Sequence, residues 1–129
     1  MIPLDGHNYN TTKWKVSELM EIGVSGDVLV TIDRKAVLES TVTMDIGIRE
    51  SKVEMTIENQ SVLKAGEIRM GLSERATVNI EIGSGSSIQV GDMLISEKGE
   101  TKIVLNEASI KSDKVTVGAE SEGKGTIEV

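Results

Sequence analysis

Apolar and polar residues alternate in short runs along most of the chain. Within residues 51–75 the apolar positions are Val53-Met55-Ile57, then Val62-Leu63, then Ile68-Met70-Leu72. Alternation over a handful of residues is typical of strands that bury one face. Connectors of two to six residues, such as ENQ, KAG and GSGS, separate the runs. The pattern therefore predicts short strands joined by tight corners.

The same apolar pattern recurs along the chain at a nearly constant interval. In one column Val28, Val53, Val78 and Ile103 follow one another at equal spacing, and Ile127 comes one position early. The other predicted columns are Val30, Met55, Ile80, Leu105 and Val129; Ile32, Ile57 and Ile82, interrupted by Glu107; Leu38, Leu63, Ile88 and Ile110; Val42, Ile68, Met93 and Val115; and Met44, Met70, Ile95 and Val117. From Gly26 onward the chain is predicted to contain four copies of one unit and the start of a fifth.

Three strands and three corners in each unit predict one coil of a triangular β-helix. The whole repeat then forms a β-solenoid of about four 25-residue coils, stacked about 4.8 Å apart. An antiparallel meander is the rival all-β architecture. It would need hairpin turns, which favour Asn-Gly or Asp-Gly, and neither pair occurs between the predicted strands. The pattern leaves open whether one chain forms each coil or three chains intertwine as a trimer, because both produce the same alternation.

The sequence divides into an N-terminal segment, residues 1–25, and a β-helical repeat domain, residues 26–129. The segment holds KWKV, typical of a strand, and SELMEIG, which predicts a short helical turn capped by Ser17 and stopped by Gly23. Two interpretations stay open for it: a cap over the first coil, or a segment that docks on another subunit. The residues expected to make these cap or assembly contacts are Trp14, Leu19, Met20 and Ile22. At the other end, TIEV predicts an open strand edge with Ile127 and Val129 available to a partner.

Composition narrows the class of protein. The net charge of −7 is spread evenly over both halves, which argues against a nucleic-acid partner. The chain has no cysteine, one Trp, one Tyr and no Phe, so a narrow core of Val, Ile, Leu and Met is expected. No apolar run is long enough for a membrane span and no signal peptide is readable. We expect a virion or cytoplasmic assembly.

Residues with catalytic potential are few. His7 is the only histidine and is expected to be a solvated loop residue, and no residue set predicts a metal, cofactor or catalytic site. Gly83 and Gly85 are expected in a corner, since no phosphate-binding motif follows them. Asp33, Glu58 and Glu81 form a possible stacked acid ladder for glycan cleavage, although solvated outward charges are the simpler interpretation. Glu107 interrupts an apolar column, which predicts either a strand end or a basic partner such as Lys102 or Lys111.

Residues 99–120, GETKIVLNEASIKSDKVTVGAE, resemble the β-helical spike segments of contractile tails in tailed phages and type VI secretion systems. The resemblance lies in short I-x-L and V-x-V strands joined by Gly, Ser, Asp and Lys corners. It implies a triangular shaft of three intertwined chains within an injection-type particle. The chain lacks room for the family's oligonucleotide/oligosaccharide-binding barrel, and it has no H-x-H iron-binding tip. The resemblance therefore implies a particle component and not the spike role in particular.

These observations predict a non-enzymatic structural protein, namely a β-helical shaft, spike or plug that assembles as a homo-oligomer, with a trimer favoured. A polymerising β-helix filament subunit is the first alternative. A carbohydrate-binding or carbohydrate-cleaving β-helix module is the second.

Overall fold

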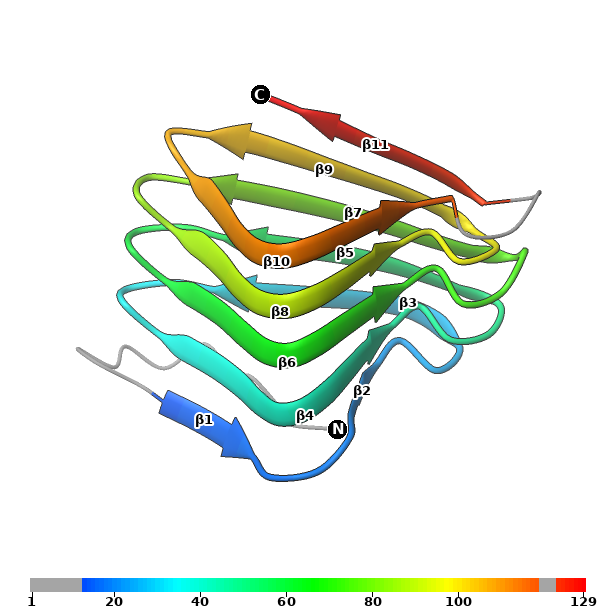
Figure 1. The fold of residues 1–129 in the computed structure, drawn as a ribbon, viewed down its shortest axis with the longest axis horizontal. Helices are drawn as coiled ribbons and strands as arrows, with labels where there is room; N and C mark the ends of the chain where they lie inside the picture. The colour runs from blue at the N-terminus through cyan, green and yellow to red at the C-terminus, as the bar shows by residue number, and fades with distance from the viewer. Residues whose placement is uncertain (1–12, 119–122) are drawn as a thin grey trace.

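Every helix or strand element in the described part of the chain is a β-strand (Figure 1). The structure is a computed structural model, and it describes residues 13–118 and 123–129. The strands are β1 (Lys13–Val16), β2 (Met20–Ile22), β3 (Gly26–Ile32), β4 (Val37–Ile46), β5 (Ser51–Ile57), β6 (Val62–Met70), β7 (Ala76–Gly83), β8 (Ser87–Ile95), β9 (Glu100–Asn106), β10 (Ser109–Val117) and β11 (Lys124–Glu128).

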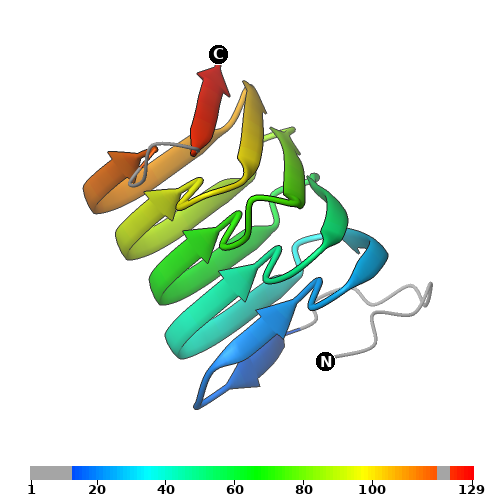
Figure 2. The same cartoon turned by 90° about the vertical axis from the view of Figure 1, so that its right-hand side faces the viewer.

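Strands that follow one another in the sequence lie in two different parallel sheets. The flat sheet has the order β11-β9-β7-β5-β3, and the bent sheet has the order β1-β4-β6-β8-β10 with β2 also pairing with β4. The chain therefore winds as a β-solenoid, and each of its coils adds one strand to the five-stranded flat sheet (Figure 2). The predicted β-solenoid is confirmed. Each coil is formed within a single chain, which is one of the two alternatives left open by the sequence.

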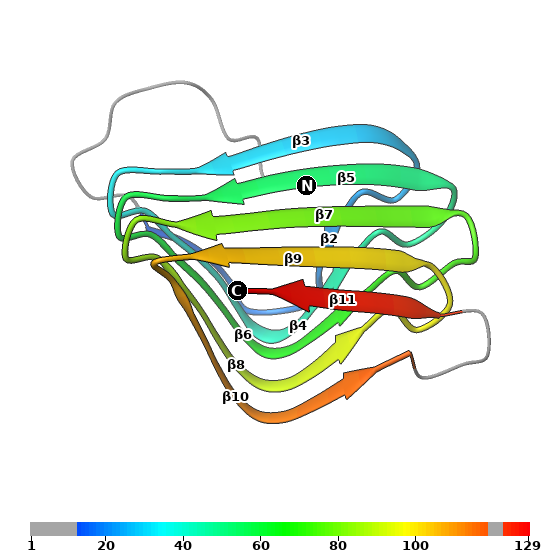
Figure 3. The ribbon, with the colours of Figure 1, turned by 90° about the horizontal axis from the view of Figure 1, so that it is seen from above.

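Seen along its axis, the solenoid is triangular (Figure 3). The flat sheet forms one side, and each long strand of the bent sheet turns in its middle to form the other two. The second and third predicted strands of a coil are thus one bent strand, such as β6. Glycine marks the bend because the coils approach closely there: a Cβ on Gly66 would lie 2.7 Å from the Val42 carbonyl oxygen, and one on Gly91 would lie 2.6 Å from that of Gly66.

The columns predicted on the bent sheet are correct from β6 to β10. Leu38, Leu63, Ile88 and Ile110 are register partners, as are Ile68, Met93 and Val115. On β4 the last two columns differ from the prediction, since Met44 and not Val42 pairs with Ile68, and Ile46 pairs with Met70. A register shift between Ser40 and Thr43 accounts for the difference and leaves Val42 exposed.

The predicted register is also wrong by two residues between β7 and β9. Ile103 pairs with Ile80, Leu105 pairs with Ile82, and Thr101 lies beside Val78. The repeat is shorter by two positions here than in the preceding coils, and a slip of two keeps each side chain on the same face. Glu107 consequently leaves the apolar column: it is exposed at φ 55° just beyond β9, which confirms the predicted strand end.

A column of residues with positive φ ends the third side of every coil. Its members are Gly23, Gly47, Gly71, Ser96 and Gly118, with φ between 59° and 75°. This conformation suits glycine, and at Gly47 an added Cβ would also lie 2.6 Å from Val78 Cγ2. The column includes Gly23, so the repeat begins before Gly26.

The second half of the N-terminal segment is part of the solenoid. β1 is the predicted KWKV strand, and it pairs with β4 from Lys13 to Val16. The predicted helical turn at residues 17–23 is wrong, because Met20 and Ile22 instead pair as strand residues with Met44 and Ile46. The apolar interior thus extends from Met20 to Ile103 as one continuous core of aliphatic and methionine side chains.

Candidate assembly surface

Large apolar side chains that are exposed gather in the first and last coils. Among the described residues these are Leu19, Val24 and Leu29 in the first coil and Val115, Val117, Ile127 and Val129 in the last, with Val42 at the bend of β4 as the exception. The edge strands of both parallel sheets also lie in these two coils. They are β1, β2 and β3 at one end of the solenoid and β10 and β11 at the other. The ends are therefore the surfaces best suited to contact other molecules.

The end formed by β10 and β11, the C-terminal end, is open. Val115, Val117 and Ile127 occupy inward columns but are 40–48% exposed, since no strand of the described residues lies beyond β10 and β11 to cover them. The outer edge of β11 offers backbone groups that pair with no other strand in the described part of the chain. Unpaired edges beside apolar side chains favour association through added strands.

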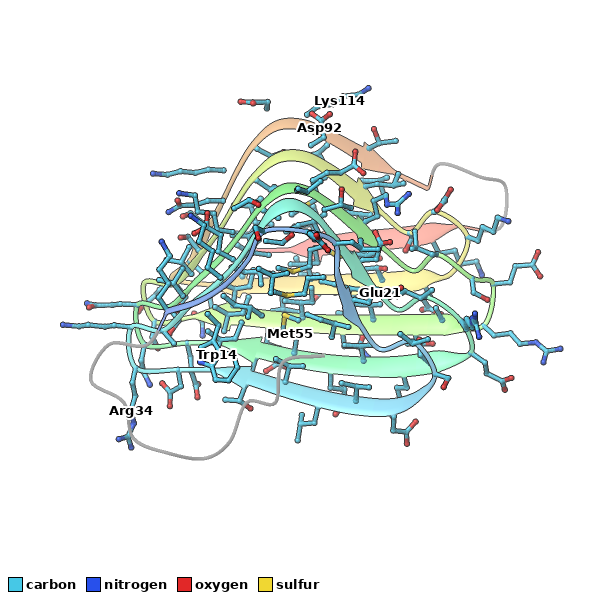
Figure 4. The ribbon with its side chains drawn as sticks, turned by 90° about the horizontal axis from the view of Figure 1, so that it is seen from below. Trp14, Glu21, Arg34, Met55, Asp92 and Lys114 are labelled. Atoms are coloured by element: carbon cyan, nitrogen blue, oxygen red, sulfur yellow. The ribbon has the colours of Figure 1, made fainter. Side chains whose placement is uncertain are left out.

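The end formed by β1, β2 and β3, the N-terminal end, is closed. Four of its inward side chains, Met20, Ile22, Val30 and Ile32, are only 3–9% exposed, and Val16 and Val28 are half-buried. Trp14 packs against this core, and Figure 4 shows its ring within the outline of the coils, whereas Arg34, Asp92 and Lys114 point away from the interior. The two ends of the solenoid thus differ in how much of the core they expose.

The six residues predicted from the sequence to make cap or assembly contacts fall at opposite ends. Trp14, Met20 and Ile22 pack into the core at the N-terminal end, and Leu19 points to solvent there. Ile127 and Val129 are exposed at the C-terminal end. The sequence reasoning did not single out Val115 and Val117. Their position as the last members of two inward columns was the available signal.

Polar side chains on the bent sheet form ion pairs between neighbouring coils. Arg69 Nε and Nη2 each donate to a different carboxylate oxygen of Asp45 at 2.7 Å, and Asp45 is buried. Such two-point pairing compensates the burial of the carboxylate. The ion pair links β4 to β6 on the outer surface of the solenoid, in the second half of these bent strands.

Glu39 lies between lysines of the neighbouring strands. Lys13 Nζ is 3.1 Å from Glu39 Oε1, and Lys15 and Lys64 are its register partners on either side. The Lys13 ammonium lowers the pKa of the Glu39 carboxyl, burial opposes this, and Lys15 and Lys64 add to the lowering. The cluster joins β1 to β4 and to β6.

The stacked acid ladder considered from the sequence is not formed as a set of three. The Asp33 carboxylate accepts hydrogen bonds from the Arg34 backbone N–H and the Asn59 side-chain amide, so it stabilises a corner. Glu58 follows the neighbouring strand, whereas Glu81 belongs to a different outward column beside Thr56. Buried serines support the same corner, since Ser61 Oγ accepts from Ala36 N–H and Ser86 Oγ accepts from Ser61 N–H.

A shallow hollow of about 410 Å³ lies on the outer surface of the flat sheet. Its lining includes Glu54, Glu81 and Lys102 but no aromatic side chain. Gly83 ends β7, and Gly85 lies in the corner after it, at φ 76° as expected for a turn. His7 lies outside the described residues.

The described residues contain neither a metal-binding cluster nor a membrane-spanning helix. Within residues 13–118 and 123–129, no cluster of three or more His, Cys, Asp or Glu side chains is arranged to hold a metal ion. The same residues contain no helix long and apolar enough to cross a membrane.

Comparisons with known proteins gave no match. The chain matches no protein-family model, no curated protein and no solved structure. The resemblance of residues 99–120 to contractile-tail spikes therefore rests on their sequence pattern alone.

Proposed function

We propose that this chain is a non-enzymatic structural protein that attaches to its assembly through the C-terminal end of the solenoid. The observation that carries the proposal is the half-exposed set of inward side chains there, Val115, Val117 and Ile127. The middle coils expose no comparable apolar set among the described residues, so their sides suit contact with solvent.

Asp33, one of the acids considered for glycan cleavage, has structural partners instead, and so does the buried Asp45. Asp33 binds the corner at Arg34 and Asn59, and the buried Asp45 is paired with Arg69. A building block that stacks coils and presents one open end accounts for both the repeat and these contacts.

A component of a phage or injection-type particle is the assembly we favour, following the resemblance of residues 99–120. The trimer expectation came from intertwined chains, and a coil closed within one chain no longer requires three. A polymerising filament subunit needs two open ends, whereas Met20, Ile22, Val30 and Ile32 are covered at the N-terminal end. A carbohydrate module is less favoured because Trp14 packs against the core.

Sedimentation of particles from the source cells tests the proposal. The tagged wild-type chain should co-sediment with a particle at fixed stoichiometry, and Val117→Lys should remain in the supernatant, because a charge on the open end opposes its burial. Val42→Lys is the matched control, since Val42 is similarly exposed but lies on the side of the solenoid. Absence of the wild-type chain from every particle, or equal loss with both variants, would refute the proposal.

A further inference from the structure

We infer that the C-terminal end binds a second copy of itself, with β11 of each copy paired antiparallel across a two-fold axis. This inference rests on the proposed attachment through that end and names its occupant: the second copy is the component of the assembly that the chain contacts there. The axis would run perpendicular to the flat sheet, so the two flat sheets would join edge to edge and keep their apolar faces on the same side.

The outward charges of β11 favour this pairing. Placing Thr126 opposite Thr126 of the second copy pairs all five residues of β11, and it brings Lys124 opposite Glu128 of the second copy at two symmetric positions. Opposite charges and Thr–Thr pairs directly across an antiparallel ladder are both stabilising. Glu128 already contacts Lys102 at 3.3 Å, and a carboxylate has acceptor capacity for a second cation.

The inward side chains fit the same arrangement. Gly125 would lie opposite Ile127 of the second copy, so a residue without a side chain meets a large one at both symmetric positions. Val115 and Val117, on the same end, would face the partner's end and lose contact with water.

Continuation of the coils head to tail is the competing arrangement. It would place β10 on β1 and β11 on β3 of the next copy. Extending the observed register would then set Lys111 beside Lys15, a like-charged pair, and Lys124 beside Asp27, an opposite-charged pair, so the charges balance and the shape of the two ends decides. It would also need an open N-terminal end, where the inward side chains of Met20, Ile22, Val30 and Ile32 are instead 3–9% exposed. The open end therefore fits a closed dimer better than a filament.

Sedimentation equilibrium of the purified full-length chain over a wide concentration range tests the inference. The wild type should be in monomer–dimer equilibrium. Lys124→Glu and Glu128→Lys each create two like-charged contacts in the homodimer, and each should weaken dimerisation about tenfold or more. An equimolar mixture of the two variants should regain wild-type affinity, because both contacts of the heterodimer then join opposite charges.

Lys52→Glu makes the same charge change on β5, in the middle of the flat sheet, and should leave dimerisation unchanged. A monomeric wild type, open filaments, single variants that dimerise like the wild type, or a mixture that fails to recover would each overturn the inference. Particle attachment without dimerisation would retain the proposed function and reject this inference. A dimer that joins no particle would retain this inference and reject the proposed function.

Discussion

Replacing Gly47 by alanine should destabilise the fold in two ways that glycine avoids at this corner, through backbone strain and through a steric clash. Gly47 has φ 75°, and an added Cβ would lie 2.6 Å from Val78 Cγ2 in the next coil. The left-handed backbone costs an alanine about 1–2 kcal/mol, and forcing a methyl group into this packed interior costs about 1–3 kcal/mol more. The expected loss in the free energy of unfolding is therefore about 2–5 kcal/mol.

Gly26 provides the matched control. Its φ is 78°, but an added Cβ would have nothing within 4 Å, so Gly26→Ala should show the backbone cost alone, about 1–2 kcal/mol. Urea and thermal unfolding followed by circular dichroism measure both variants, and about 1 kcal/mol corresponds to a Tm change of roughly 4 °C in a domain of this size.

Val78 identifies the source of the additional cost. If its side chain is the obstacle, Val78→Ala should destabilise the Gly47→Ala background less than it destabilises the wild type, by about 0.5–3 kcal/mol of coupling. Equal losses for Gly47→Ala and Gly26→Ala, or purely additive effects in this cycle, would refute the packing argument.

Three further predictions concern core packing, an unpaired hydroxyl and acid stability. Leu63→Ala should lower the unfolding free energy by about 2–5 kcal/mol and Glu54→Ala by under about 0.5 kcal/mol in urea titrations, and equal effects would contradict the assigned faces. Thr101→Val should raise the melting temperature, because the buried hydroxyl has no hydrogen-bond partner; a fall would show that the hydroxyl is satisfied. The Glu39 pKa is lowered by Lys13, so its stabilisation is complete above the ordinary glutamate pKa of 4.5 and is lost as pH falls through the lowered value. Glu39→Gln should therefore lose less stability on acidification than the wild type, and parallel acid-unfolding curves would contradict this.

The start of the repeat is readable from the sequence alone. MEIG at residues 20–23 recurs as MDIG at residues 44–47, and both segments end in the glycine column. Met20 pairs with Met44 and Ile22 with Ile46. The unusual composition of residues 1–25 obscures this match, and Ser17 and Gly23 there also satisfy the pattern of a capped helical turn. The positive φ of Gly23 marks a coil corner instead.

The candidate surface was only partly predictable. Ile127 and Val129 followed from the alternation in TIEV, because an inward residue is exposed where no strand of another coil covers it. The same rule applied to Val115 and Val117, but using it required knowing that β10 is the last strand of the bent sheet. The closure of the N-terminal end depends on the packing of Trp14 and on the burial of Met20 and Ile22, which no local pattern reveals.

By itself the sequence determined which face most strand residues present and where most corners fall, with Val42 and the turn predicted at residues 17–23 as the exceptions. Alternation has a period of two, and the positions that need positive φ favour glycine, so both properties are local. Which residue stacks on which was decided only by the tertiary structure. A slip of two residues leaves every side chain on its face, so Ile103 fits over Val78 or Ile80 equally well in the pattern. Corner lengths and packing between coils placed it on Ile80, and they likewise closed each coil within one chain and left one end of the core exposed.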